Sequence, residues 1–115
     1  MAVSFSTRKL DGVMVLDLTG RLILGSGDMG VHDRVMEQVA AGERRLVLNL
    51  SGVSYIDSSG LGEMARALAA ARRGGAELKL SSPTGKVHDL IRVTNLYKIF
   101  DVQDTDEAAA RAFGG

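Results

Sequence analysis

The hydrophobic pattern changes its period at the centre of the chain, between Leu46 and Leu68. Apolar residues first alternate over positions 46–50, as in a strand covered on at least one face, and the strand pauses at Ser51-Gly52 before resuming through Ile56. Beyond Asp57-Ser58-Ser59-Gly60 the apolar residues recur at helical spacing, at Leu61, Met64, Ala65 and Leu68. The pattern therefore predicts a strand that runs into a helix across two serines.

The N-terminal third predicts a β-hairpin followed by a helix. Residues 3–7 alternate, Asp11-Gly12 is typical of a hairpin turn, and residues 13–18 form the return strand. Val13, Val15 and Asp17 share one face of that strand, and the other face carries Met14, Leu16 and Leu18. A short apolar run over 21–24 predicts a further strand, and a loop over 25–30 precedes a helix that extends to about Ala41. The buried stripe of that helix includes Val31, Val35 and Val39.

The C-terminal third predicts two more strand–helix pairs. A strand over 76–80 leads through a turn to a helix capped by Thr84, with Val87, Leu90 and Ile91 as its apolar stripe. After a loop over 94–96, a strand over 99–102 precedes a terminal helix. The inward side chains of that helix are expected to be Ala108, Ala109, Ala112 and Phe113. This order predicts one domain over residues 1–115, an α/β (α+β) fold with a mixed sheet and helices on one side or wrapping an edge.

Composition excludes several classes of function. Fourteen basic residues balance fourteen acidic ones, which argues against nucleic-acid binding through bulk charge. The chain has no cysteine, so thiolate catalysis and cysteine zinc sites are excluded. No apolar run approaches the roughly 20 residues of a membrane span, and the N-terminus does not resemble a signal peptide. We therefore expect a cytoplasmic protein that binds neither nucleic acid nor membranes.

The two serines at the predicted start of the helix are the main candidate for chemistry. Ser58 stands at the expected N-cap, where its hydroxyl serves either as a plain cap or as a reactive group, and Ser59 has the same alternatives. A phosphate on Ser58 would be expected to meet the N–H groups of Gly60 and Leu61. Asp57 is either a carboxylate at a helix start or a source of repulsion beside a phosphate.

Other patterns favour no enzyme. The loop Gly25–Gly30 matches G-x-G-x-x-G, but the run before it is barely a strand and the ribose-binding acid is missing, so a plain loop is favoured over a nucleotide site. The residues before Ser58 do not fit the serine hydrolase motif G-x-S-x-G. His32 and His88 lack the carboxylate spacing of a metal site. We expect no catalytic residue, metal or cofactor.

The segment LVLNLSGVSYIDSSGLG, residues 46–62, resembles the signature of STAS domains, most closely the bacterial anti-sigma factor antagonists. The resemblance covers nearly the whole chain. It includes Leu18-Thr19-Gly20 after the hairpin, the strand within 74–80, the pattern VxxLIxxTNL over 87–96 and Phe100 near the last strand. It implies a small mixed β-sheet flanked by about four helices.

For function, the resemblance implies a partner switch. The unphosphorylated domain would bind an anti-sigma factor that is also a serine kinase of the histidine-kinase-like ATPase type. That kinase would release it by phosphorylating Ser58, and a PP2C-type phosphatase would reverse the step. We expect a monomer that docks its partner through Asp57, Ser58, Ser59, Gly60, Glu63, Arg66, Leu22 and Met29. The alternative is an accessory or scaffold STAS domain, in a stressosome or beside a transporter, without a phosphorylation cycle.

The chain departs from the family pattern after Gly20. Many members carry an acidic residue, an apolar residue and then aspartate at this point, where this chain has Arg21, Leu22 and Ile23. The loop tends to lie beside the phosphorylated serine in the family. This departure therefore affects which partner the domain is expected to bind.

Overall fold

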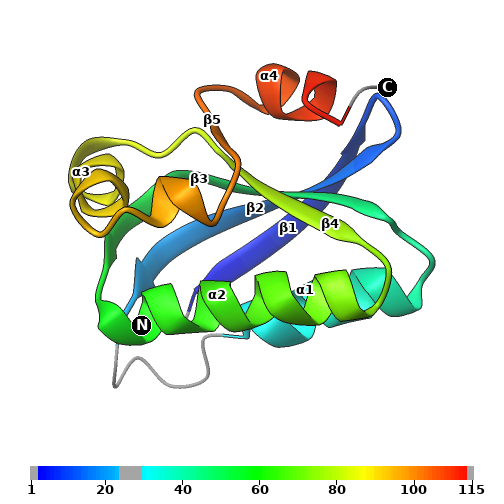
Figure 1. The fold of residues 1–115 in the computed structure, drawn as a ribbon, viewed down its shortest axis with the longest axis horizontal. Helices are drawn as coiled ribbons and strands as arrows, with labels where there is room; N and C mark the ends of the chain where they lie inside the picture. The colour runs from blue at the N-terminus through cyan, green and yellow to red at the C-terminus, as the bar shows by residue number, and fades with distance from the viewer. Residues whose placement is uncertain (1–2, 24–29, 114–115) are drawn as a thin grey trace.

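The computed structural model describes residues 3–23 and 30–113, which form five strands and four α-helices (Figure 1). The strands are β1 (Ser4–Leu10), β2 (Val13–Leu22), β3 (Arg45–Ile56), β4 (Glu77–Ser81) and β5 (Val102–Gln103). The helices are α1 (Val31–Ala40), α2 (Ser58–Arg73), α3 (Gly85–Val93) and α4 (Asp106–Arg111), with a short 3₁₀ turn at Leu96–Lys98.

The strands form one sheet in the order β1-β2-β3-β4-β5. β1 and β2 are an antiparallel hairpin, and every other neighbouring pair is parallel. Asp11 and Gly12 form the hairpin turn with φ angles of 51° and 80°, as a two-residue turn with two left-handed positions requires. The mixed sheet expected from the sequence is therefore confirmed, and its strands follow one another in chain order.

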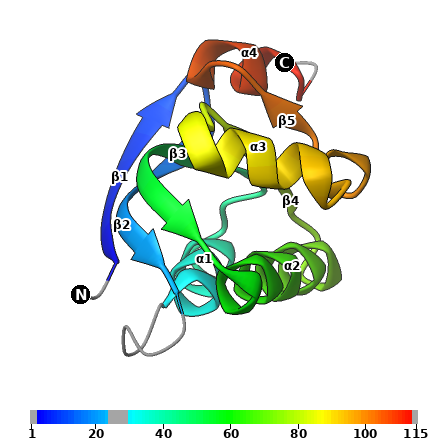
Figure 2. The same ribbon diagram turned by 90° about the vertical axis from the view of Figure 1, so that its left-hand side faces the viewer.

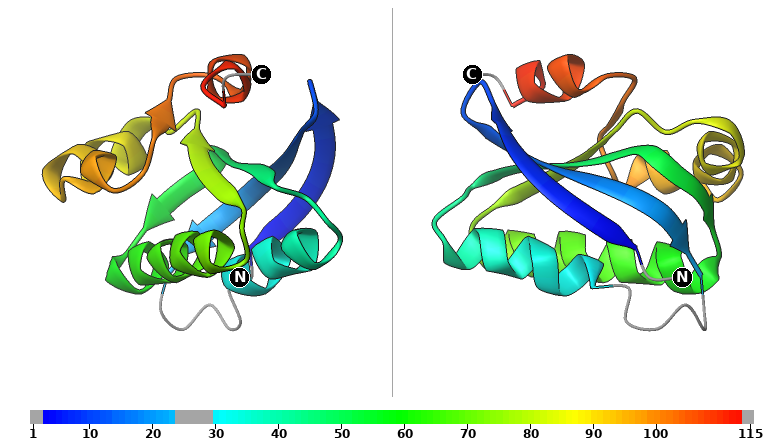
Figure 3. Two further views of the ribbon diagram at one scale, coloured as in Figure 1. Left: turned by 45° about the vertical axis from the view of Figure 1, so that its right-hand side comes forward. Right: turned by 180° about the vertical axis from the view of Figure 1, so that it is seen from behind.

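Because side chains alternate along the strands, the two faces of the sheet contribute to two different apolar clusters. Leu16, Leu18 and the leucines of β3 pack with the buried stripes of α1 and α2, which lie side by side beneath the sheet (Figures 1 and 3). The opposite face, with Val13, Val15 and Val47, packs against Ala109 and Ala110 of α4. α3 lies above the end of β3 (Figure 2), and its buried Val87 and Ile91 belong to the larger cluster with α1 and α2. Helices thus cover both sides of the sheet, which corrects the expectation of one side or one edge.

Several local predictions were wrong. The apolar run after Gly20 is not a separate strand: β2 continues to Leu22 with register shifts against β3 near Thr19 and Gly20. The last strand begins at Val102 rather than residue 99, and Ile99 is 52% exposed. In the terminal helix Ala112 is exposed and Ala110 is buried instead. Thr84 holds the N-cap position of α3, but its side chain makes no capping hydrogen bond.

A polar cluster under α4 ties this helix to three strands. Asp106 accepts hydrogen bonds from Ser81 Oγ at 2.5 Å and from Asn49 Nδ2 at 3.1 Å. It also receives the guanidinium of Arg8, which pairs with Asp17 as well. Hydrogen bonds to the two carboxylates, first Asp17 and then Asp106, raise the pKa of Arg8. Because Ser81 is fully buried and Asn49 nearly so, Asp106 satisfies donors that water does not reach.

Candidate functional site

The junction between β3 and α2 lies at the carboxyl end of β2. The N–H of Asp57 donates to the carbonyl oxygen of Leu22 at 3.0 Å, which joins the start of the helix to the neighbouring strand. Asp57 is the N-cap of α2: its Oδ1 accepts a hydrogen bond from the N–H of Gly60 at 3.0 Å. Ser58 is the first residue of the helix, so the expectation that Ser58 caps it was wrong.

The Ser58 side chain is exposed, and among the described residues no group hydrogen-bonds its hydroxyl. Asp57 takes both of the N–H groups that were expected to meet a phosphate, through Oδ1 for Gly60 and through its carbonyl oxygen for Leu61. The first turn of a helix leaves earlier N–H groups without an intrahelical partner, here those of Ser58 and the half-buried Ser59. An anion at this end would meet those groups instead.

Gly60 is buried because α2 approaches the end of β2 closely. A Cβ at this position would lie 2.3 Å from the Leu22 carbonyl oxygen, 2.7 Å from Leu22 Cβ and 2.9 Å from Ile56 Cγ2. Leu22 is itself 0% exposed. Both residues are buried and hold the first turn of α2, with Ser58, against the end of β2. Their place in a docking surface stays a prediction.

Glu63 and Arg66 lie further along α2, near α1. Glu63 Oε1 pairs with the exposed Arg66 at 2.7 Å, and Glu63 Oε2 accepts from the backbone N–H of His32 at 3.3 Å. Glu63 therefore links the two helices, and 13% of its side chain is exposed. Met29 and most of the loop Gly25–Gly30 lie outside the described residues.

The structure adds residues that the sequence reasoning did not single out. Tyr55, three positions before Ser58, is 42% exposed. Its partner in β2 is Arg21, and Lys86 Nζ of α3 lies 6.0 Å from the centre of its ring. Alternation along β3 offered a signal, because Ile56 is apolar and its neighbour Tyr55 must then face the other way. The approach of α3 depends on tertiary packing, and no local pattern indicates it.

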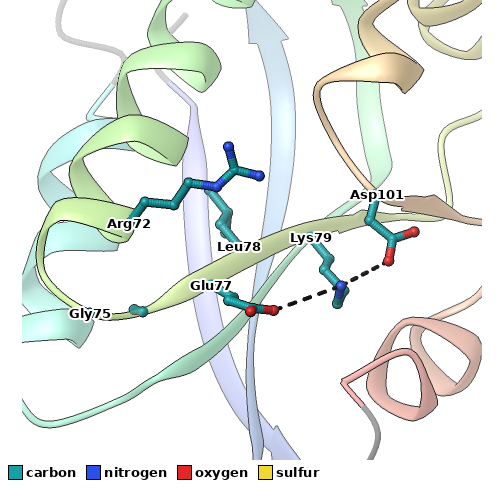
Figure 4. A pocket seen from close by; sticks show the side chains of 7 residues that line it. Arg72, Gly75, Glu77, Leu78, Lys79 and Asp101 are labelled. Atoms are coloured by element: carbon teal, nitrogen blue, oxygen red, sulfur yellow. Dashed lines mark hydrogen bonds and ion pairs between the residues drawn. The ribbon is translucent and has the colours of Figure 1, made fainter.

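A cavity of about 390 Å³ lies at the other end of α2, against the edge of β4 (Figure 4). Its lining includes Arg72, Leu78 and the ion pair of Lys79 with Asp101, whose charged atoms are 2.8 Å apart. The hydrogen bond from Lys79 holds the pKa of Asp101 below its ordinary value. Because Ser58 begins the helix and Arg72 stands in its last turn, this cavity is separate from the serine site.

Within the described part of the chain, no three His, Asp or Glu side chains gather as metal ligands would. His32 and His88 lie on different helices and both are partly exposed. None of the helices in the described ranges combines the length and apolarity needed to cross a membrane.

A comparison with known protein families gives a match over nearly the whole chain. The family model of the STAS domain matches residues 4–109, from the first strand to the last helix. The chain belongs to the STAS domain family. The match includes the junction at Ser58 and the hairpin that supports it, so the resemblance drawn from the DSSGLG segment is confirmed.

Two relatives of this STAS domain carry names from one regulatory class. It is 31% identical over 105 residues to BtrV of Bordetella bronchiseptica, provisionally named an anti-sigma factor antagonist, covering 91% of this chain and 90% of BtrV. It is 28% identical over 96 residues to the anti-sigma F factor antagonist of Paenibacillus polymyxa, covering 83% of this chain and 81% of that protein.

Two solved structures with names from the same class have a similar fold. The Thermotoga maritima protein TM1081, given the same provisional name in its crystal structure, superposes with a TM-score of 0.76 at 27% identity, over 94% of this chain and 92% of TM1081. SpoIIAA, an anti-sigma factor antagonist in its unphosphorylated form, has a TM-score of 0.64 at 18% identity, over 97% of this chain and 99% of its own. The second likeness bears on the fold alone.

Proposed function

We propose that this STAS domain is an anti-sigma factor antagonist controlled by phosphorylation of Ser58. In its unphosphorylated form it binds an anti-sigma factor of the histidine-kinase-like ATPase type, and that kinase releases it by phosphorylating Ser58. The observation that carries the proposal is the exposed Ser58 hydroxyl at the start of α2, which is not engaged as the helix cap. The names of the relatives in Bordetella and Paenibacillus support the same role.

The position suits a reversible phosphate. A phosphoserine carries about −1.5 to −2 charges at pH 7, and the partial positive charge at a helix N-terminus favours an anion there. The N–H groups of Ser58 and Ser59 are available as donors, whereas Asp57 keeps its hold on Gly60. The added charge would act at the docking surface rather than in the core.

Phosphorylation can be tested with the kinases of the source organism. Each purified ATPase-type kinase of its genome would be incubated with this protein and radiolabelled ATP. We expect one kinase to label the protein and Ser58→Ala to abolish the label. Ser59→Ala is the matched control, because it removes the neighbouring hydroxyl and should retain the label. A PP2C-type phosphatase should remove it.

Binding provides the second measurement. We expect Ser58→Ala to bind the kinase persistently in the presence of ATP, and Ser58→Asp to bind poorly by titration calorimetry. Label that persists on Ser58→Ala would move the acceptor to another residue. An absence of label from every kinase would favour the scaffold or accessory role instead.

A further inference from the structure

A surface patch near the end of β3 contains an exposed aromatic ring and two cations. Arg21 and Tyr55 are partners across β2 and β3, so their side chains emerge on the same side of the sheet. Lys86, the second residue of α3, places its Nζ 6.0 Å from the centre of the Tyr55 ring. We call Arg21, Tyr55 and Lys86 the cationic patch. Ser58 is close to the patch in the chain, because it follows Tyr55 by three positions and begins α2 just after β3 ends.

The two cations of the cationic patch have no carboxylate partner among the described residues. Both cations are exposed, and across residues 3–23 and 30–113 neither Arg21 nor Lys86 forms an ion pair. The carboxylates near the start of α2 are engaged elsewhere, since Asp57 caps Gly60 and Glu63 pairs with Arg66. Although the whole chain has a net charge of 0, this surface presents two positive charges that no described carboxylate pairs with, at an exposed aromatic ring.

We propose that the cationic patch is the specificity surface for a partner with an acidic docking face. This inference deepens the proposed function and rests on it, because it names the chemistry of the surface that binds beside Ser58. Tyr and Arg are among the side chains enriched at the residues that dominate binding energy, and complementary charge contributes to partner choice and association rate. A partner that presents Asp or Glu side chains to Arg21 and Lys86 matches the patch, and a basic face is repelled.

The same arrangement gives phosphorylation a second effect. A phosphate on Ser58 would add about −1.5 to −2 charges beside a surface that carries two positive ones. It would cancel the attraction for an acidic partner as well as occupy space in the interface. Release would then be electrostatic, and its extent would fall as salt screens the charges.

The test reverses the charge of the patch. Arg21→Glu with Lys86→Glu should weaken binding to the anti-sigma factor kinase at least about tenfold, mostly through a slower association rate. Arg73→Glu is the matched control, because Arg73 is an exposed arginine in the last turn of α2, at the opposite end from Ser58. It should leave affinity unchanged. Circular dichroism and thermal melting would verify that each variant folds.

A second probe does not depend on identifying the kinase. The protein would be titrated with a short glutamate-rich peptide and with its lysine-rich counterpart, and backbone amide shifts would be followed by NMR. We expect the acidic peptide to shift the amides of Arg21, Tyr55 and Lys86 in a salt-dependent way. The basic peptide should leave them unchanged. Shifts scattered over the surface, or absent from the patch, would overturn the inference.

The two proposals fail in distinguishable ways. If the kinase labels Ser58 but the charge-reversed variant binds it as tightly as the wild type, the cationic patch is not the specificity surface. If no kinase labels Ser58 but the acidic peptide still binds at Arg21 and Lys86, the patch stands and the phosphorylation cycle fails. Preference for the lysine-rich peptide would contradict the charge argument directly.

Discussion

Replacing Gly60 by alanine tests whether close packing sets the position of the serine site. The added Cβ would lie 2.3 Å from the Leu22 carbonyl oxygen, well inside contact distance, and that oxygen also accepts the N–H of Asp57. Neither the strand nor the helix can yield cheaply, because the obstructing atom belongs to the backbone. Gly62, one half-turn further along α2, offers a control: a Cβ there meets only Arg66 Nη1, at 3.5 Å.

The two substitutions should change the unfolding free energy in opposite directions. Overpacking of a core costs about 1–3 kcal/mol, and contact with a fixed carbonyl places Gly60→Ala toward the upper end even after the gain in helix propensity. We expect Gly60→Ala to lose about 2 kcal/mol of unfolding free energy. Gly62→Ala should gain up to about 1 kcal/mol, because alanine favours the helix and meets no obstacle.

Urea unfolding of both variants, monitored by circular dichroism, measures the difference directly. The two variants should be separated by about 3 kcal/mol, which is on the order of 10 °C in melting temperature for a domain of this size. Equal stability of the two variants would show that the first turn of α2 has room to move. Close packing at Gly60 would then not fix the position of Ser58.

Further predictions concern the helix cap, the polar cluster and one ion pair. Asp57→Ala should destabilise the protein by about 1 kcal/mol in urea unfolding, and Ser58→Ala by less than about 0.5 kcal/mol, the reverse of a serine cap. Asp106→Ala should cost about 3 kcal/mol and accelerate hydrogen exchange in α4, because it strands buried donors; adding Ser81→Ala should recover part of the loss. The pKa of Asp101 lies below its ordinary value of 3.8, so the stability it contributes is present above that value and is lost as pH falls through the folded-state pKa. Asp101→Asn should therefore make the unfolding free energy fall less steeply in acid, and an unchanged pH profile would contradict that assignment.

Local patterns in the sequence predict most of the fold. The turn at Asp11-Gly12, the alternation of β2 and the stripe of Val31, Val35 and Val39 each carry a periodic or conformational signal, and each is confirmed. The end of β2 was mistaken for a separate strand because Gly20 reads as a turn residue. In the structure it lies at a register shift within one strand, which only its pairing with β3 reveals.

The site was less accessible to sequence reasoning, since its details are tertiary. A serine and an aspartate are both good helix caps, so the pattern Asp57-Ser58 does not say which of them begins the helix. Burial of Gly60 follows from the approach of Leu22, which lies far away in sequence. The pairing of Tyr55 with Lys86 requires α3 to lie above the end of β3, and no periodicity encodes that arrangement.

The division of labour between Asp57 and Ser58 has a consequence for how often the site can be used. Because the Asp57 carboxylate caps α2, the Ser58 hydroxyl is not needed as the cap of the helix. A phosphate added to Ser58, as proposed, would leave the hydrogen bond from Gly60 to Asp57 intact. Repeated addition and removal of the phosphate would then not require the helix cap to form again.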